Sequence, residues 1–195
     1  MTVVQRTPIL LAMAEPLPKP WTLADYLAWE GQQPERYEFV GGVLRAMVGG
    51  TLDHNTIARN IARELDGLLR PKGCRVFASD VKVVSFDTGQ AAYPDVVATC
   101  ASQRGGDTEV AEPALVAEVL SRSTGDYDRS AKLEFYKAMP SLRYVLLVAQ
   151  DRMLADLYRR TQAGWEVIRF AEGAVPLDEF GGSLPLDAIY ADVKV

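Results

Sequence analysis

The sequence predicts an α/β protein in which a mixed β-sheet is flanked by helices. Apolar residues recur at helical spacing over residues 53–69, which is typical of an amphipathic helix. Several stretches between residues 74 and 149 are rich in Val and Ala, as buried strands are. Between Glu118 and Tyr144 a buried run, a helix and another buried run follow one another. That order indicates a crossover between parallel strands.

One domain is enough to account for the chain. At 195 residues it can bury a substantial core, and no internal repeat divides it. The hydrophobic fraction of 48% and the charged fraction of 24% are those of an ordinary globular protein. Residues 1–20 contain four prolines. We expect them to form an extended lead-in, and residues 21–195 to form a single domain.

Charge and cysteine content narrow the classes of function. A net charge of −5 argues against a broad nucleic-acid-coating surface, although it leaves room for a local basic cleft. Cys74 and Cys100 form no CxxC pair and there is one histidine, so we expect reduced, buried thiols. The apolar segment 8–16 is too short to span a bilayer and lacks a convincing cleavage context. A cytoplasmic location is therefore expected.

The first half of the domain contains clear helix and hairpin signals. Thr22 is placed to cap a short helix that follows it. Residues 36–50 alternate on either side of Gly41-Gly42, which predicts a hairpin with a two-residue turn. The helix over residues 53–69 is the clearest element, and the sequence RPKG ends it.

The second half is richer in strands. Three strand-like stretches, CRVFASDVKVVSF, AAYPDVVATC and ALVAEVLS, precede a helix over DRSAKLEFYKAM that ends before Pro140. Three more strands are expected at LRYVLLVA, MLADLYRR and GWEVIRFA. The remainder, VPLDEFGGSLPLDAIY, is expected to consist of loops and short edge pieces.

Three acids lie in apolar surroundings where a strand would ordinarily carry Val or Leu. Glu38 stands in YEFV, Asp95 in YPDVVA and Glu118 in LVAEVLS. Burying a lone charge is costly, so such an acid usually has a partner, a metal or a chemical role. A hard divalent cation would account for the three acids together, because Mg²⁺ commonly takes one or two carboxylates with waters and phosphate oxygens.

Lys132 is the nearest candidate cation. It lies fourteen residues after Glu118 on the helix predicted over DRSAKLEFYKAM. If this helix packs back over the sheet, its face with Lys132 and Tyr136, at i and i+4, overlooks the strand that carries Glu118. Arg129 is placed on the same side by its i, i+3 spacing.

These residues resemble a known superfamily. The order YPD, then AEVLS, then DYDRSAKLEFY is similar to the PD-(D/E)XK nucleases, and within them to the Uma-type family of restriction endonucleases, formerly a domain of unknown function. The likeness runs from ADYLAWE to RYVLLV and continues more loosely beyond. It implies a restriction-endonuclease-like core. The chain departs from the E-x-K pattern, because the third position of EVL is Leu120.

The resemblance also implies roles for individual residues. Asp95 and Glu118 would hold Mg²⁺, or Mn²⁺ in its place, with Glu38 as an extra or second-metal acid. Lys132 would take over the role of the motif lysine. The implied activity is hydrolysis of phosphodiester bonds in DNA, with Asp95, Glu118, Lys132 and Glu38 catalytic. By analogy with such enzymes, a homodimer is expected.

Other interpretations remain at this point. Asp95 would cap a backbone group at a strand entry, Glu118 would form a buried salt bridge, and Lys132 would lie on a solvated helix face. His54 is expected to be a capping or surface residue. For the whole chain, the alternatives are a decayed nuclease fold retained for binding or dimerisation, and a hydrolase of a small phosphorylated substrate.

Overall fold

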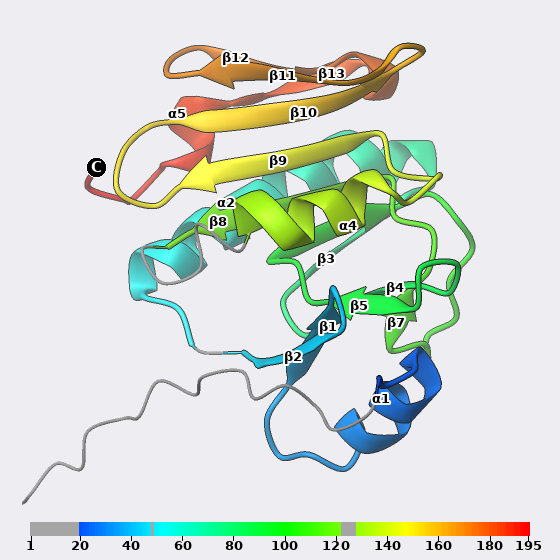
Figure 1. The fold of residues 1–195 in the computed structure, drawn as a ribbon. Coiled ribbons are helices and arrows are strands. Elements are labelled where there is room, and N and C mark those ends of the chain that lie inside the picture. Colours follow the sequence, from blue (N-terminus) through cyan, green and yellow to red (C-terminus); the bar gives the residue numbers. More distant parts are fainter. Residues whose placement is uncertain (1–19, 48, 122–127) are drawn as a thin grey trace, which may run out of the picture.

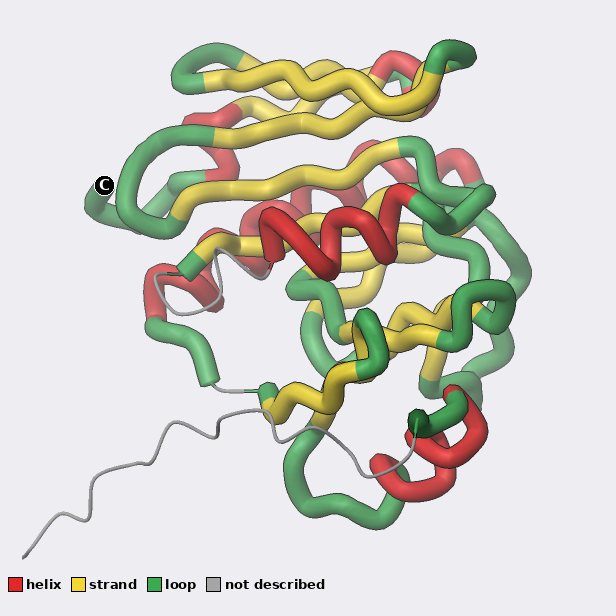
Figure 2. Tube along the Cα trace, in the orientation of Figure 1, coloured by secondary structure: helices red, strands yellow, loops and turns green. Residues whose placement is uncertain are grey.

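The computed structural model describes residues 20–47, 49–121 and 128–195, with side chains given from residue 130 onward in the last range. The predicted lead-in of residues 1–20 therefore lies outside the described residues, apart from Pro20. A six-stranded mixed sheet forms the centre, with helices on both faces (Figures 1 and 2). The predicted fold class is confirmed. In the described part of the chain, no helix is long and apolar enough to cross a membrane.

The central sheet contains the predicted crossover. Its strands are, in spatial order, β11 (Gly164–Phe170), β10 (Ala155–Thr161), β9 (Tyr144–Ala149), β8 (Leu115–Leu120), β6 (Val96–Thr99) and β3 (Arg75–Ala78). β8 and β9 pair in parallel, with Glu118 opposite Leu147, and the other neighbours are antiparallel. The carboxyl ends of β8 and β9 therefore lie at the same edge of the sheet.

Helices α2 (Leu52–Leu69) and α4 (Leu133–Lys137) cover opposite faces of this sheet (Figure 1). Side chains alternate along β8, so Ala117 and Val119 pack in the core with α2, whereas Val116 and Leu120 pack in the core with α4. The predicted apolar stripe of α2 is confirmed by its fully buried members Ile57, Ile61, Leu65 and Leu69.

A single 3₁₀ turn, η1 (Arg70–Lys72), follows α2. Gly73 then ends the helical segment in the left-handed conformation, with φ 80°. A glycine adopts this conformation without the steric penalty of a Cβ atom, as predicted for RPKG.

A second sheet lies beside the first and carries the amino-terminal elements. It contains, in order, β2 (Val43–Ala46), β1 (Tyr37–Val40), β5 (Gln90–Ala92), β4 (Lys82–Ser85) and β7 (Glu109–Val110). Helix α1 (Leu23–Glu30) packs on it after a capping box between Thr22 and Asp25. Gly41 and Gly42 form the turn between β1 and β2 at φ 62° and 76°. The predicted cap and hairpin are both confirmed.

The strand prediction between residues 74 and 100 was wrong in one respect. CRVFASDVKVVSF forms two strands, β3 and β4, because Ser79 and Asp80 adopt left-handed conformations with φ of 55° and 56°. AAYPDVVATC likewise divides into β5 and β6 around Pro94. Each stretch leaves one sheet and enters the other. Asp95 consequently lies at the junction of the two sheets, one residue before β6.

The carboxy-terminal segment is more regular than predicted. β12 (Ala174–Leu177) and β13 (Gly182–Pro185) pair antiparallel around the 3₁₀ turn η3 (Asp178–Phe180), and α5 (Leu186–Ile189) follows. Val175, Leu184 and Ile189 are fully buried and join the core beneath α2. In Figure 1, β12 and β13 are drawn at the same end of the molecule as β11.

The expectation of reduced thiols is contradicted by a disulfide between Cys74 and Cys100. In the antiparallel pairing of β3 with β6, Arg75 lies opposite Thr99. The next residues outward, the two cysteines, therefore face each other, and their Cα atoms are 4.0 Å apart. They are separated by 26 positions in the sequence. Their proximity follows from strand register, which spacing alone does not reveal.

Candidate active site

Three of the predicted site residues meet at a buried point between the two sheets. The Lys132 ammonium lies 2.7 Å from Glu118 Oε1 and 2.9 Å from Glu38 Oε1. Glu118 comes from the middle of β8, Glu38 from β1, and Lys132 from the turn before α4. All three residues are at most 5% exposed. Buried charges require partners, and here one cation is shared by two carboxylates.

Local helix geometry aims Lys132 inward. Residues Asp128–Lys132 form a π-helical turn, η2, which continues directly into α4. Such turns interrupt the regular α-helical spacing and are frequent at functional sites. The predicted position of Lys132 over Glu118 is confirmed. The side chain of Arg129, which was placed on the same side, lies outside the described residues.

Tyr136 follows one turn later and contacts the same acid. Its hydroxyl donates to Glu118 Oε1 at 2.6 Å, and the side chain is fully buried. Burial raises the pKa of Tyr136 well above its usual range, and the charge of Glu118 raises it further, against an opposing effect of Lys132. The phenol therefore stays protonated and acts as a hydrogen-bond donor to the carboxylate.

Tyr93 is a site residue that sequence reasoning missed. It lies between β5 and β6, where its backbone N–H donates to Glu38 Oε1 at 2.9 Å. Its carbonyl accepts from Lys132 Nζ at 3.4 Å. Tyr93 thus lies in the segment that passes from one sheet to the other, and its main chain contacts both Glu38 and Lys132. Backbone contacts of this kind leave no residue-type signal in a sequence.

A second buried ion pair lies beside the first. The Tyr93 hydroxyl donates to Glu30 Oε1 at 2.7 Å, and Lys82 Nζ lies 3.0 Å from Glu30 Oε2. Burial acts to raise the pKa of Glu30, but the hydrogen bonds from Tyr93 and Lys82 and the charge of Lys82 lower it overall. A lysine within the apolar stretch VKVVS was a usable signal for this pair, comparable to the acid in YPDVVA.

Asp95 lies next to the buried cluster, at the protein surface. Its Oδ2 accepts from the Val119 backbone N–H at 2.7 Å, and His54 Nε2 lies 3.2 Å from the same oxygen. The Asp95 and His54 side chains are 22% and 18% exposed. The backbone contact agrees with the capping alternative for Asp95. Val119 directly follows Glu118 in β8, so this contact places the Asp95 carboxylate next to the strand position that carries Glu118.

The donor set suits a hard cation in part. Asp95 and Glu118 offer carboxylate oxygens, the kind of ligand that Mg²⁺ prefers. Among the described residues, however, no three His, Cys, Asp or Glu side chains are grouped so as to hold a metal ion. Asp95 and Glu118 are two carboxylates, the number that Mg²⁺ commonly takes together with water and phosphate oxygens, whereas Glu38 is engaged by Lys132.

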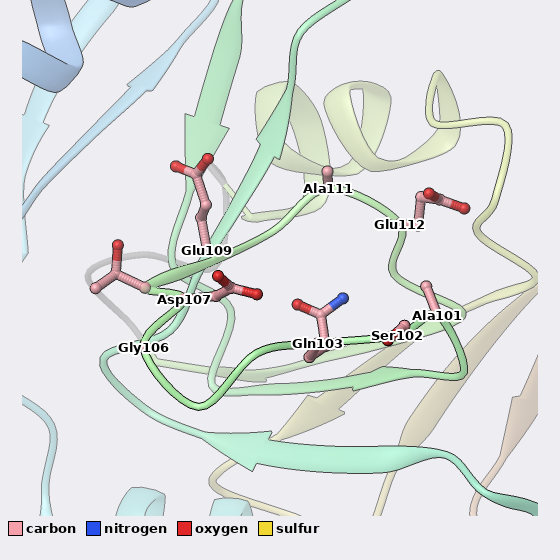
Figure 3. A pocket seen from close by; sticks show the side chains of 9 residues that line it. Ala101, Ser102, Gln103, Gly106, Asp107, Glu109, Ala111 and Glu112 are labelled. Atoms are coloured by element: carbon pink, nitrogen blue, oxygen red, sulfur yellow. The ribbon is translucent and has the colours of Figure 1, made fainter.

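A polar pocket among the described residues lies elsewhere. It has a volume of about 560 Å³ and is formed by residues 101–112 around β7. Figure 3 shows that the carboxylates of Asp107, Glu109 and Glu112 point in different directions and do not converge. None of the predicted site residues lines this pocket. It therefore does not compete with the buried cluster as a centre of chemistry.

The crossover from β8 through α4 to β9, with an acid on the first strand and a lysine before the helix, places this fold in the restriction-endonuclease-like class. Sequence comparison makes the assignment specific. The chain belongs to the Uma2 family, described as "Putative restriction endonuclease", whose profile matches residues 23–187. The resemblance inferred from the sequence is confirmed.

Individual relatives agree with this assignment. "Uncharacterized protein slr1290" of Synechocystis sp. (strain ATCC 27184 / PCC 6803 / Kazusa) is 34% identical over 169 residues, which are 85% of this chain and 89% of the relative. "Uncharacterized protein sll1609" of the same organism is 32% identical over 142 residues, 71% of this chain and 80% of the relative.

A solved structure shares the fold. The crystal structure of "a putative nuclease belonging to DUF820" from Anabaena variabilis ATCC 29413 aligns with a TM-score of 0.71 and 18% identity. It covers 88% of this chain and 98% of its own. At this level of identity the likeness establishes the shared fold.

Proposed function

We propose that this protein is a metal-dependent endonuclease that hydrolyses phosphodiester bonds in DNA. The observation that carries the proposal is the buried Lys132 ammonium, held by Glu118 and Glu38 beside Asp95. A fully desolvated lysine at the crossover of this fold is difficult to explain by stability alone, because burying charges usually costs as much as their attraction returns. Membership of the Uma2 family supports a nuclease role.

Asp95 and Glu118 would hold the cation, Mg²⁺ or Mn²⁺. Bound there, the ion would supply positive charge to phosphate oxygens and make a water molecule more acidic. Asp95 is the more exposed of the two acids, so we infer that substrate approaches from the side of Asp95 and His54. Tyr136 and Lys132 both contact Glu118 Oε1 and fix that carboxylate in place.

Lys132 would stabilise charge that develops on the reacting phosphate. Its ammonium group has three donors, and it contacts Glu118, Glu38 and the carbonyl of Tyr93. The contact to Tyr93, at 3.4 Å, is the longest of the three. Among these three contacts, a substrate oxygen or a water would replace this one more readily than either carboxylate. In this scheme Glu38 serves to hold Lys132, which revises its expected role as a metal ligand.

The test is a nuclease assay on plasmid and oligonucleotide DNA with Mg²⁺ or Mn²⁺. We expect Lys132→Met to reduce the cleavage rate about 10²- to 10³-fold, as loss of a charge-stabilising donor does elsewhere. Asp95→Asn should reduce it at least as much. Lys137→Met is the matched control, because Lys137 lies on the same helix but pairs with the exposed Glu134. It should retain activity within about twofold.

Two outcomes would oppose the proposal. If Lys132→Met and Asp95→Asn both cleave at the wild-type rate, the assigned site is wrong. If the wild-type protein cleaves no nucleic acid with either metal, a decayed nuclease fold that serves in binding or dimerisation becomes the better account. Leu120, in the position of the motif lysine, would then be a mark of that decay. The predicted homodimer is measured separately by light scattering during size-exclusion chromatography.

A further inference from the structure

His54 occupies a place that its expected role as a cap or surface residue does not explain. It lies in the first turn of α2, and its Nε2 is 3.2 Å from Asp95 Oδ2. The imidazole side chain is 18% exposed, although the residues on either side of it, Asp53 and Asn55, are exposed. The ring therefore turns inward from the helix toward the proposed metal ligand.

Several contacts fix the start of α2, where His54 lies. Thr51 caps α2 by accepting from the His54 backbone N–H at 3.2 Å, and Gln150 donates to the Thr51 hydroxyl at 2.7 Å. Gln150 directly follows β9, so the start of α2 is tied to the end of the parallel strands. Gly50 lies against the ring. A Cβ atom there would stand 2.8 Å from His54 Nδ1, closer than non-bonded atoms approach.

The hydrogen-bond chemistry of Asp95 determines what His54 does. An ionised carboxylate only accepts hydrogen bonds, so His54 Nε2 has to carry a hydrogen for its 3.2 Å approach to Asp95 Oδ2 to be a hydrogen bond. Oδ2 of Asp95 accepts from the Val119 N–H at 2.7 Å and also lies 3.2 Å from His54 Nε2. These two contacts on one oxygen restrict rotation of the carboxylate and leave Oδ1 as the oxygen available to a cation.

We propose that His54 is a positioning residue, which orients the Asp95 carboxylate so that Oδ1 is presented to the divalent cation. This inference rests on the proposed function. His54 would not itself be a ligand in this arrangement, because the nitrogen that faces Asp95 would point its hydrogen toward that carboxylate. Partners that orient metal ligands in this way commonly change metal affinity or activity 10- to 100-fold when removed.

The first test measures binding of Mn²⁺ and of Mg²⁺ by calorimetry. His54→Leu removes the donor, and we expect it to weaken binding of both ions about 10- to 100-fold. His54→Gln keeps an amide N–H near the place of Nε2 and should recover binding to within about threefold. Asn55→Leu, a change of similar size on the neighbouring exposed position, should bind as the wild type does. Unfolding midpoints of the three variants should agree with the wild type within a few degrees.

The second test uses the fact that His54 is the only histidine in the chain. Long-range ¹H–¹⁵N NMR spectra therefore report on its ring without assignment. We expect the Nε2–H tautomer in the wild-type protein, a change in Asp95→Ala, and retention of Nε2–H when Mg²⁺ is added.

The outcomes separate this inference from the proposed function. If the wild type binds metal and His54→Leu binds it equally well, the positioning role is refuted while the metal site stands. Loss of Nε2–H on addition of Mg²⁺, or failure of His54→Gln to restore binding, would make His54 a ligand and likewise overturn the inference. If the wild type binds neither ion, the proposed metal site itself is wrong, and the positioning role falls with it.

Discussion

Replacing Lys132 by Met should destabilise the fold strongly, because the ammonium is the charge that compensates Glu38 and Glu118. The lysine is 4% exposed, and its contacts with the two carboxylates are 2.9 Å and 2.7 Å long. Methionine matches the aliphatic part of the side chain but removes the ammonium that both buried carboxylates contact. Breaking a buried ion pair from one side typically costs 3–5 kcal/mol, of which most is the desolvation of the remaining charge.

That free energy converts to a measurable shift. For a domain of 150–250 residues, 1 kcal/mol moves the melting temperature by about 2–4 °C, so Lys132→Met should melt about 6–20 °C below the wild type. Urea unfolding followed by tryptophan fluorescence measures the same loss directly. The double variant Glu38→Gln/Lys132→Met carries one buried charge fewer and should recover part of the loss. It also provides a folded protein for the nuclease assay if the single variant unfolds.

The control for this prediction is Lys137→Met on the same helix. Lys137 pairs with Glu134, whose side chain is 71% exposed, and surface pairs of this kind contribute about 0–1 kcal/mol. If Lys132→Met were no less stable than Lys137→Met, the contacts of Lys132 with Glu38 and Glu118 would not stabilise the fold as inferred here. A double variant less stable than Lys132→Met would also contradict the reasoning.

Two further predictions concern the supports of the site. The pKa of Glu30 is lowered in the fold, so its stabilising contribution is present above its ordinary value of 4.5 and is lost as the pH falls below it. The difference in unfolding free energy between wild type and Glu30→Gln should therefore shrink on acidification in urea titrations, and a constant or growing difference would contradict it. Arg160 donates to three main-chain carbonyls, those of Lys137 at the end of α4 and of Met139 and Leu142 just after it. Arg160→Met should lower the free energy of unfolding by about 1–3 kcal/mol in urea titrations, and Arg160→Lys should lower it by less. An Arg160→Met variant as stable as the wild type would show that the three contacts do not stabilise the fold.

Local structure could be predicted from the sequence because it depends on neighbouring residues. The cap at Thr22 and the Gly41-Gly42 turn both follow from short-range geometry, and the structure shows them as expected. The face of the crossover helix that carries Lys132 followed from helical spacing combined with the apolar pattern of the strands on either side. The acids at 38 and 118 were visible because their neighbours are apolar.

The division of two strand-like stretches between two sheets could not be predicted. An apolar run carries the same pattern whether it continues straight or turns into another sheet. The decisive features, the left-handed Ser79 and Asp80, are residues that can also lie in a regular strand. The register of β3 against β6, and with it the disulfide between Cys74 and Cys100, depends on where these turns fall.

The sequence by itself determined the class of fold and the charged residues that require partners, because helical spacing and the cost of burying a charge are visible residue by residue. Only the tertiary structure decided which partners they take. In the structure Glu38 pairs with Lys132, and the Tyr93 backbone contacts both residues. His54 lies against Asp95, which is 41 positions away in the sequence. Such contacts arise where separate elements pack, and their distances depend on register and on helix placement that no short segment encodes.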